Sequence, residues 1–369
     1  MSWVVYLVAI PVFAVIVLIH EFGHFITAKW AGIRVEEFGI GFPPRAVGIK
    51  RGETIYSINW LPLGGFVRMP GENGETTDAA GQPDPGSFSA KPAHKRIIVL
   101  LAGVTMNMLL AIVLFGAADA AGQIVNYQPV IGKVTSGSPA AQAGLRNGDR
   151  ILAVNGQPVK YWFDMTDAVS RVTDTTPDYV QTVSVTLLVR HAGKNEPVTA
   201  VTVEARAHPT PQQGHFGIQV DDAGAIIQRI PVWEIPQDGV KQVGTVVGSI
   251  GSAFAQIFQG KLAFTDAFSG PVGIVDITGQ VASAVPQVGL YPILYLTGAL
   301  SVSLAVMNVL PFPALDGGRV LLILIEVVRR GKRLSPEREG LLNLAGMAVL
   351  LTFIMVITFF DVSKIFGGH

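Results

Sequence analysis

The sequence predicts a membrane α-helical protein with four transmembrane helices, a membrane-associated β-hairpin region and one inserted α+β domain. The first observation behind this prediction is composition, because 49% hydrophobic and 15% charged residues in a chain of 369 is too apolar for an ordinary soluble enzyme. The second is that four separate segments reach the length and apolarity of a membrane span. The third is a long polar stretch between the second and third of these segments, in which strand patterns alternate with turn residues. The net charge of zero carries no information about nucleic-acid binding, and no nucleic-acid partner is expected.

The first predicted helix covers residues 1–25 and ends in the sequence His20-Glu21-Phe22-Gly23-His24. It lacks a basic start and a small-residue cleavage site, so we interpret it as a retained helix and not as a removed signal peptide. In a helix, His20 and His24 lie one turn apart on one face, the spacing that lets two imidazoles share a Zn²⁺ ion while Glu21 stands beside a bound water. Chance would produce this pattern in the chain with a probability of only roughly half a percent. The pattern is typical of a metalloprotease active site and predicts His20 and His24 as metal ligands and Glu21 as catalytic base.

A β region and a loop are expected over residues 26–95. Residues 54–60 alternate in the manner of a half-buried strand, and Gly64-Gly65 follow in a strand-like run. A glycine pair there indicates either close backbone approach by another chain or a plain turn. Residues 73–89 are polar and rich in Gly and Pro, which favours a loop.

The second helix is expected over residues 96–118. Gly103 and Asn107 lie one turn apart on it, which suits close helix packing with the asparagine bonding across the interface. We prefer this interpretation to a direct catalytic part for Asn107.

The inserted domain is expected over residues 126–222. Its sequence predicts a strand, a short helix capped near Ser138, a second strand that ends at Asn155-Gly156, a helix near residues 163–172 and two later strands. This arrangement resembles a PDZ domain of the bacterial, circularly permuted kind, although an unrelated β domain is an alternative. Near its end, Gly214-His215-Phe216-Gly217-Ile218 resembles the loop that holds the terminal carboxylate of a peptide on backbone amides. The resemblance implies that Gly214, Phe216, Gly217 and Ile218 bind a peptide or a protein C-terminus.

Residues 223–290 connect this domain to the last two spans. Within them, residues 240–258 alternate small and apolar positions, which favours an interfacial helix over a fifth crossing. The third span is expected over residues 291–328, interrupted by Pro311-Phe312-Pro313, and the fourth over residues 340–361.

A catalytic zinc site needs a third protein ligand, and Asp316 in the interrupted third span is the best candidate. The chain has no cysteine, so His and carboxylate side chains must supply all ligands. Irregular backbone at membrane depth is tolerated only where protein buries it or where it lines a wet cavity, so the interruption indicates a site. A helix cap is the alternative role for Asp316.

Lys and Arg residues gather in two of the connecting segments, residues 26–95 and the turn between the third and fourth spans. Because positive residues favour the cytoplasmic side, both segments should be cytoplasmic. The inserted domain should then be extracytoplasmic, with the active site nearer the cytoplasmic side of the membrane.

Taken together, these motifs resemble the site-2 protease family of intramembrane zinc metalloproteases, and in particular its RseP-type bacterial members, the regulator of sigma-E proteases. The resemblance covers nearly the whole chain in the order of the family. The segments that carry it are His20–His24, Pro62–Met69, Lys91–Asn107, the PDZ-like region, Ser269–Ile274 and Asn308–Gly318. The chain departs from the family at Val104, where proline is usual, and in having room for one PDZ domain where many relatives have two.

The resemblance implies His20, His24 and Asp316 as zinc ligands, Glu21 as catalytic base, and Asn308 as a contact to substrate. It also implies that the Gly64-Gly65 region pairs with substrate as a β-strand. The expected activity is cleavage of single-span membrane proteins, such as an anti-sigma factor or signal-peptide remnants, after a prior extracytoplasmic cut. The alternatives are a catalytically inactive membrane PDZ scaffold and a membrane zinc peptidase that acts on soluble peptides. A transporter is disfavoured because the sequence has no internal repeat.

Overall fold

A computed structural model describes residues 3–72, 84–173, 175–177, 180–193, 197–209, 214–263 and 267–366 of the chain. These residues form two compact units. The first contains residues 1–121 and 230–369, and the second contains residues 122–229. The loop predicted over residues 73–89 lies outside the described residues as far as residue 83.

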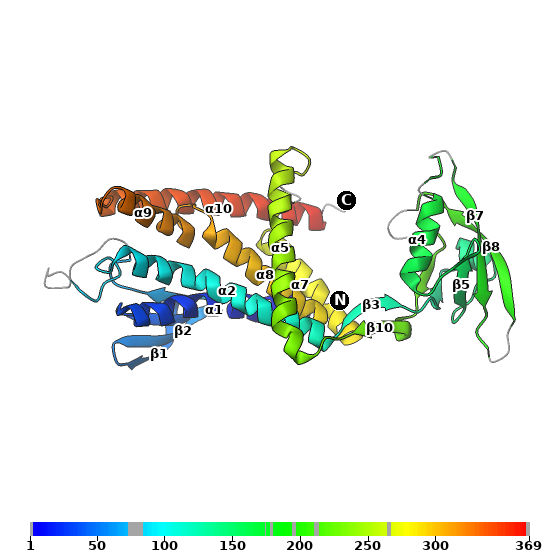
Figure 1. Cartoon of the computed structure of the whole chain (residues 1–369), viewed down its shortest axis with the longest axis horizontal. Helices are drawn as coiled ribbons and strands as arrows, with labels where there is room; N and C mark the ends of the chain where they lie inside the picture. Colours follow the sequence, from blue (N-terminus) through cyan, green and yellow to red (C-terminus); the bar gives the residue numbers. More distant parts are fainter. Residues whose placement is uncertain are drawn as a thin grey trace. The chain divides into compact units, whose positions relative to one another are not determined.

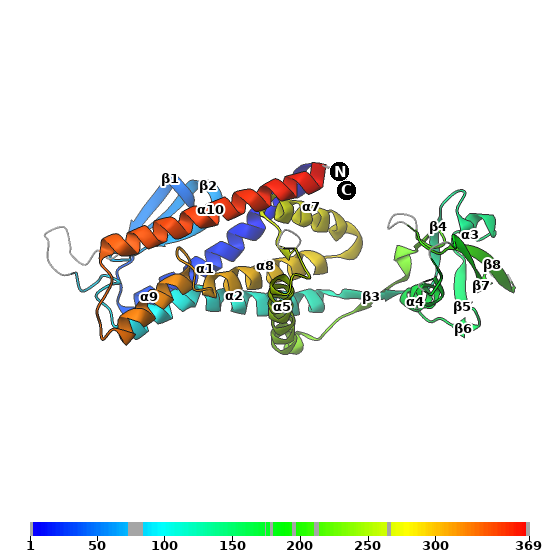
Figure 2. The same ribbon diagram turned by 90° about the horizontal axis from the view of Figure 1, so that it is seen from above.

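Within the described residues, four helices are long and apolar enough to cross a membrane, and this confirms the number predicted from the sequence. The helices of the first unit are drawn in Figures 1 and 2, where α5 runs across α2 and α8 and not along them. The helix α5 is not among the four that could span. The main helices of this unit are α1 (Ala9–Ala31), α2 (Ala93–Ala121), α5 (Ile235–Phe258), α7 (Pro271–Val288), α8 (Tyr291–Val309), α9 (Asp316–Val328) and α10 (Pro336–Phe366), with short 3₁₀ turns at Trp3–Val8 and Val232–Glu234.

The helix α1 continues past the end of its apolar run. The first span was expected to end at residue 25, but α1 continues to Ala31 and ends where Gly32 takes a left-handed conformation with φ 73°. Apolar residues mark the part of a helix that lies in hydrocarbon, whereas the helical backbone hydrogen bonds continue until a residue such as glycine ends the helix. The HExxH sequence therefore lies in the middle of α1, and not at its end as expected.

The third predicted span consists of two helices, with the break at the prolines that the sequence predicts. The helix α8 ends at Val309, α9 begins at Asp316, and residues 310–315 between them are irregular. The prolines at 311 and 313 lack the backbone N–H that a continuous helix needs, which explains the break. At 13 residues, α9 is too short to cross a bilayer alone.

The strands β1 (Glu37–Arg51) and β2 (Thr54–Arg68) form a sheet in which each strand bends and pairs more than once. Residues 45–51 pair with 54–59 across the turn at Gly52. Residues 37–40 have partners on both sides, residues 55–58 and residues 65–68. In the part of the chain that the structure describes, residues 65–68 have a partner on one side only, so they form an edge of the sheet.

A buried apolar cluster joins α1, the sheet edge, α2 and α9. Its buried members include Ala28 of α1, Val67 of β2, Leu100 of α2 and Ile323 of α9, with Phe88 beside them. This core fixes α1, α2 and the sheet edge against one another on the side of the unit where the histidines lie.

The second unit is an α+β fold with its own core. Its strands form a sheet in the order β6-β5-β7-β8 and two pairs, β4 with β9 and β3 with β10. Ser138 caps α3 by accepting a hydrogen bond from the Ala141 amide, and Asn155-Gly156 form the tight turn after β5 with φ 46° and 79°. The elements are β3 (Gln123–Tyr127), β4 (Ile131–Val134), α3 (Pro139–Gln142), β5 (Arg150–Val154), β6 (Gln157–Pro158), α4 (Trp162–Thr173), β7 (Thr182–Arg190), β8 (Val198–Arg206), β9 (Ile218–Val220) and β10 (Ala225–Gln228), with a 3₁₀ turn at Asp222–Gly224.

Candidate metal centre and active site

His20 and His24 lie on one face of α1, as the helical spacing requires. Both residues are buried, each with 6% of its surface exposed. Their rings meet edge to face with centroids 4.7 Å apart, and the two Nε2 atoms are 3.1 Å apart. Two nitrogen donors therefore point to one place inside the protein.

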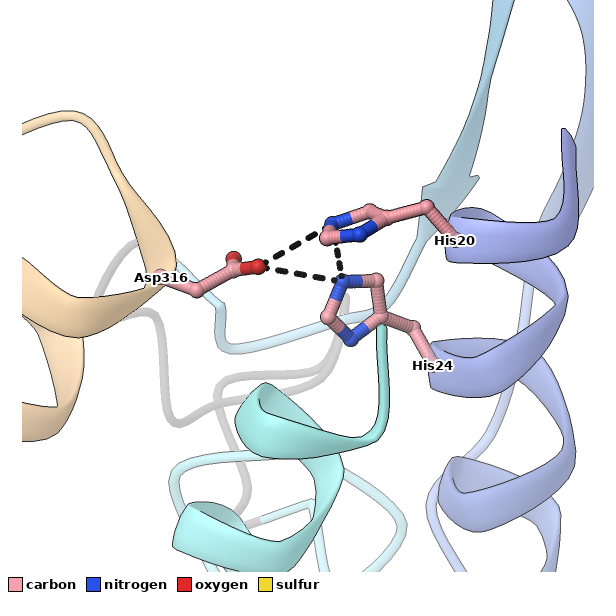
Figure 3. Close-up of side chains that lie close together, drawn as sticks. All are labelled: His20, His24 and Asp316. Atoms are coloured by element: carbon pink, nitrogen blue, oxygen red, sulfur yellow. Dashed lines mark hydrogen bonds and ion pairs between the residues drawn. The ribbon is translucent and has the colours of Figure 1, made fainter. Parts of the chain in front are cut away.

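The third member of the cluster is Asp316, which comes from a different helix. Its Oδ2 atom lies 3.1 Å from Nε2 of His20 and 3.4 Å from Nε2 of His24 (Figure 3). Asp316 is the first residue of α9, and the N-cap position belongs to Leu315, which makes no side-chain cap bond. Asp316 is therefore not the N-cap residue of α9, which was the alternative role. Its carboxylate in the first turn is nevertheless favoured by the helix dipole.

The three donor atoms fit the geometry of a zinc ion. Ligand bonds of 2.0–2.1 Å in a tetrahedral site require donor atoms about 3.3 Å apart. The observed separations of 3.1, 3.1 and 3.4 Å surround that value. Among the residues that the structure describes, these three form the one group of His, Cys, Asp or Glu side chains close enough to hold a metal ion.

A cavity of about 260 Å³ opens onto the three donors. Glu21 and Asn308 line it together with the metal-site residues, so the structure brings together the catalytic and metal residues predicted from the sequence. The Asn308 amide donates to the Leu304 carbonyl oxygen at 3.1 Å, which fixes its side chain at the cavity wall. Glu72, which was not predicted from the sequence as a site residue, also lines the cavity.

Glycines allow the helices to approach closely enough to form this centre. A Cβ atom at Gly23 would lie 2.5 Å from the Ala102 carbonyl oxygen, so α1 and α2 touch backbone to backbone. At the broken span, a Cβ at Gly317 or Gly318 would come within 2.2 Å or 2.1 Å of a carbonyl oxygen in residues 309–312. Only glycine lets α9 fold back beneath the end of α8, which places Asp316 opposite the imidazoles.

The predicted substrate-pairing residues lie at the sheet edge beside this cavity. Gly64 and Gly65 are buried, and the hairpin turn is at the far end of β2, at residues 52–53. A Cβ at Gly65 would lie 2.9 Å from the Gly39 carbonyl oxygen and 3.7 Å from Cγ of Glu21. At Gly65 two backbones therefore lie close together, but the second one is Gly39 of the same sheet and not another chain. Gly64 has φ 83°, a left-handed conformation that favours glycine.

The predicted peptide-binding loop belongs to the second unit. Gly214 and Gly217 have positive φ angles of 59° and 73°, and Ile218 begins β9. The Phe216 side chain is part of the core, with 3% exposed, and the Phe216 carbonyl accepts a hydrogen bond from Ala140. The loop therefore lies against α3 with Phe216 pointing inward.

Sequence reasoning missed two contacts of the imidazoles. Nδ1 of His24 lies 2.8 Å from the backbone oxygen of Val99, which no side-chain pattern could reveal. The Asn107 amide nitrogen lies 3.5 Å from Nδ1 of His20, although the sequence favoured a packing role for Asn107. A buried asparagine in an apolar helix was the available signal, but its partner depends on how α1 and α2 cross.

Comparison with known proteins gives the family. Residues 8–353 match the profile of peptidase family M50. The chain belongs to this family. A protein of Clostridium acetobutylicum is 32% identical over 362 residues, which cover 98% of each chain. The zinc metalloprotease RasP of Geobacillus kaustophilus is 30% identical over 97% of each chain, and the regulator of sigma-W protease RasP of Bacillus subtilis is 27% identical over 97% of this chain and 98% of its own.

Membership of family M50 makes the chain a zinc metalloprotease of the site-2 protease type, as the sequence predicted. The four apolar helices make it a membrane protein. Zinc is accordingly the metal expected at the three donors.

Proposed function

We propose that the protein is an intramembrane zinc endopeptidase that cuts single-span membrane proteins within the bilayer. In this proposal His20, His24 and Asp316 bind zinc and Glu21 is the catalytic base. The observation that carries it is the convergence of three donor atoms, from two helices almost 300 residues apart in sequence, to within 3.1–3.4 Å. Glu21 lines the same cavity and is not needed as a ligand, which supports a catalytic role.

The depth of the centre supports cleavage inside the membrane. His20 precedes Lys29, the first Lys or Arg of α1, by 9 residues, which corresponds to about 14 Å along the helix axis. That distance is about half the thickness of a hydrocarbon core. A peptide bond that reaches the donors therefore lies within the span of its own protein.

Glu21 performs the proton transfers of the reaction. Zinc, when bound, would polarise the scissile carbonyl and acidify the attacking water. Glu21 takes one proton from that water as its oxygen bonds to the carbonyl carbon, and then gives the proton to the amide nitrogen as the C–N bond breaks. The products are a new amine and a new carboxylic acid, which ionises by giving the second proton of the water to the amine or to solvent.

Asn308 is proposed to orient the substrate. One hydrogen of its amide is used by the Leu304 carbonyl oxygen, which leaves the second hydrogen for a substrate carbonyl in the cavity. A donor placed at the developing oxyanion would lower the barrier of the reaction.

The edge of the sheet is proposed to receive the substrate. A helical substrate must unwind before cleavage, because its carbonyls are bonded within its own helix. Strand addition to residues 65–68 would give the unwound backbone new hydrogen-bond partners in a water-poor setting. The closeness of Gly65 to Glu21 supports this edge as the docking strand, since it brings an added strand to the cavity.

The second unit is proposed to be an extracytoplasmic PDZ domain that docks or filters substrates. Its order of elements and the glycine-bounded loop at Gly214–Gly217 support the assignment. Basic residues gather in residues 26–95 and 329–338. This supports a cytoplasmic location for these two segments and an extracytoplasmic location for the second unit, across the inner membrane. Anti-sigma factors and signal-peptide remnants, already cut outside the membrane, are the proposed substrates, and the name of the Bacillus subtilis relative, regulator of sigma-W protease, supports the first.

The deciding experiment compares wild type with Glu21→Gln in a purified, reconstituted system. The substrates are a single-span membrane protein with a shortened external part and a soluble peptide of the same cleavage sequence. We expect wild type to cut only the membrane protein, and Glu21→Gln to retain stoichiometric zinc while losing at least 10³-fold in rate, on the order of a removed general base and its positioning. Glu337→Gln, on an exposed helix end, is the matched control.

Retained activity in Glu21→Gln would remove Glu21 from its role. Efficient cleavage of the soluble peptide would instead favour a membrane peptidase of soluble substrates, and zinc without any cleavage would favour a scaffold.

A further inference from the structure

Asn107 is a buried polar residue beside the metal centre. Its side chain lies on α2 with none of its surface exposed. The amide nitrogen faces Nδ1 of His20 at 3.5 Å. The amide oxygen, Oδ1, is buried and has no hydrogen-bond partner among the residues that the structure describes. An unpaired buried carbonyl of this kind is unfavourable, so it requires an explanation.

The neighbouring histidine shows what an outer partner does to a ligand. Nδ1 of His24 lies 2.8 Å from the Val99 carbonyl oxygen, which can only accept a hydrogen bond. The neutral ring must therefore carry its hydrogen on Nδ1. Its Nε2 atom then offers a lone pair to the point that His20 and Asp316 also face.

The same requirement applies to His20. Its Nε2 atom faces His24 and Asp316, so this nitrogen must offer the lone pair if the residue binds a metal. The hydrogen is then on Nδ1 and needs an acceptor. An asparagine amide has nearly the same shape after a half-turn that exchanges its oxygen and nitrogen. That half-turn would place Oδ1 of Asn107 against Nδ1 of His20 and so satisfy both groups.

We propose that Asn107 is a positioning residue for the metal centre, whose Oδ1 atom accepts a hydrogen bond from Nδ1 of His20 and holds the Nε2 lone pair toward zinc. This inference rests on the proposed function, in which His20 is a zinc ligand.

The surroundings of Asn107 hold its side chain in place. Ser301 of α8 donates to the backbone oxygen of Asn107 at 2.9 Å, which fixes α2 against α8 at this level. One turn earlier, Gly103 leaves room for the His20 ring, since a Cβ there would lie 2.6 Å from its Cε1 atom. The competing explanation is that Asn107 only packs between helices.

The test measures zinc affinity of the metal-stripped full-length protein in detergent, by competition with a chromophoric chelator. Asn107→Leu removes the acceptor and keeps the number and branching of the side-chain heavy atoms, and Asn107→Asp keeps an acceptor and removes the donor. We expect Asn107→Leu to bind zinc about 10- to 100-fold more weakly, the usual effect of losing an outer partner. We expect Asn107→Asp to stay within a few-fold of wild type. Ser301→Ala, which perturbs the same helix contact without touching the imidazole, should match wild type.

Thermal unfolding of the metal-free variants separates positioning from packing. A positioning role leaves the metal-free Tm of Asn107→Leu close to that of wild type and reduces the rise in Tm on adding zinc. A lowered metal-free Tm with unchanged zinc affinity would overturn the proposal, and so would Asn107→Asp binding zinc as weakly as Asn107→Leu. Asn107→Ala serves as a second substitution if leucine prevents folding.

His20→Ala distinguishes failure of this inference from failure of the proposed function. If His20→Ala binds zinc as tightly as wild type, the proposed metal centre is wrong. If His20→Ala loses zinc while Asn107→Leu retains full affinity, the centre stands and only the role of Asn107 is wrong.

Discussion

Gly103 on α2 packs against the imidazole of His24, and a Cβ atom added at residue 103 would lie 2.5 Å from Nε2 of that ring. The same Cβ would lie 2.7 Å from Nε2 of His20. The second helix therefore forms the back wall of the metal centre, and the size of one residue decides whether both rings can point to a common ion.

We expect Gly103→Ala to displace the rings and to abolish stoichiometric zinc binding, with activity reduced at least 100-fold. The physical reason is that a contact under 3 Å between a methyl group and a ligand atom forces one of them to move. Zinc content per purified chain is the measurement. Gly248→Ala on α5, where a Cβ meets nothing within 4 Å, is the control and should keep full zinc. Full zinc in Gly103→Ala would contradict the close contact.

Removing the metal should lower stability through binding linkage. A ligand held only by the folded protein stabilises it by RT ln(1 + [L]/Kd), about 4 kcal/mol at a thousandfold excess over Kd. We expect a strong chelator to lower the Tm of wild type and of Glu21→Gln by similar amounts. His24→Ala should already melt at the lower temperature and show no further change. A chelator effect on His24→Ala equal to that on wild type would mean that the stabilising metal sits elsewhere.

The buried ion pair between α2 and α9 should contribute strongly to the free energy of unfolding. Nη2 of Arg96 lies 2.7 Å from Oε1 of Glu326, and both side chains are largely buried. We expect Arg96→Met to lower the free energy of unfolding by about 3 kcal/mol, because it leaves a buried carboxylate without its main partner. Arg96→Met combined with Glu326→Gln should recover most of that loss. Denaturant unfolding in detergent measures the free energy of unfolding of each variant. If the losses from the two substitutions simply add in the double variant, Arg96 and Glu326 are not energetically coupled.

Glu37 should make the sheet sensitive to acid. Its carboxylate is buried, which by itself raises its pKa, but hydrogen bonds from Arg45 and Ser57 and the charges of Arg45 and Arg68 outweigh burial and leave the pKa below its usual value. A lowered folded-state pKa gives stability that is present above the unfolded value of about 4.5 and is lost as pH falls through the folded value. We expect wild type to lose stability on acidification below pH 4.5. Glu37→Gln should be less stable than wild type at neutral pH and lose less on acidification, and parallel pH profiles for the two proteins would contradict this.

Ala314 tests the geometry of the broken span. It lines the catalytic cavity with φ 78°, a left-handed conformation that disfavours any side chain. We expect Ala314→Gly to keep activity within about twofold and to stabilise the protein by up to about 1 kcal/mol, whereas Ala314→Val should destabilise it and weaken zinc binding. The Tm and the zinc affinity of the two variants are the measurements. Equal behaviour of glycine and valine would show that the backbone at this position is relaxed.

The sequence by itself determined the local parts of this protein. Spacing of one helical turn places His20 and His24 on one face whatever surrounds them, and prolines 311 and 313 break the third span because they lack an N–H. The number of apolar segments long enough to cross a bilayer gives the number of spans, and turn residues such as Asn155-Gly156 mark where a strand of the second unit ends. The order of these motifs along the chain was enough to predict the family.

Only the tertiary structure decided how distant segments meet. Asp316 reaches the imidazoles because Gly317 and Gly318 let α9 fold beneath α8, and the sheet edge at residues 65–68 exists because β1 and β2 each bend and pair twice. The contact of Asn107 with His20 depends on the crossing of α1 and α2 at Gly23. Such contacts arise from packing between elements far apart in the chain, and periodicity along one element carries no information about them.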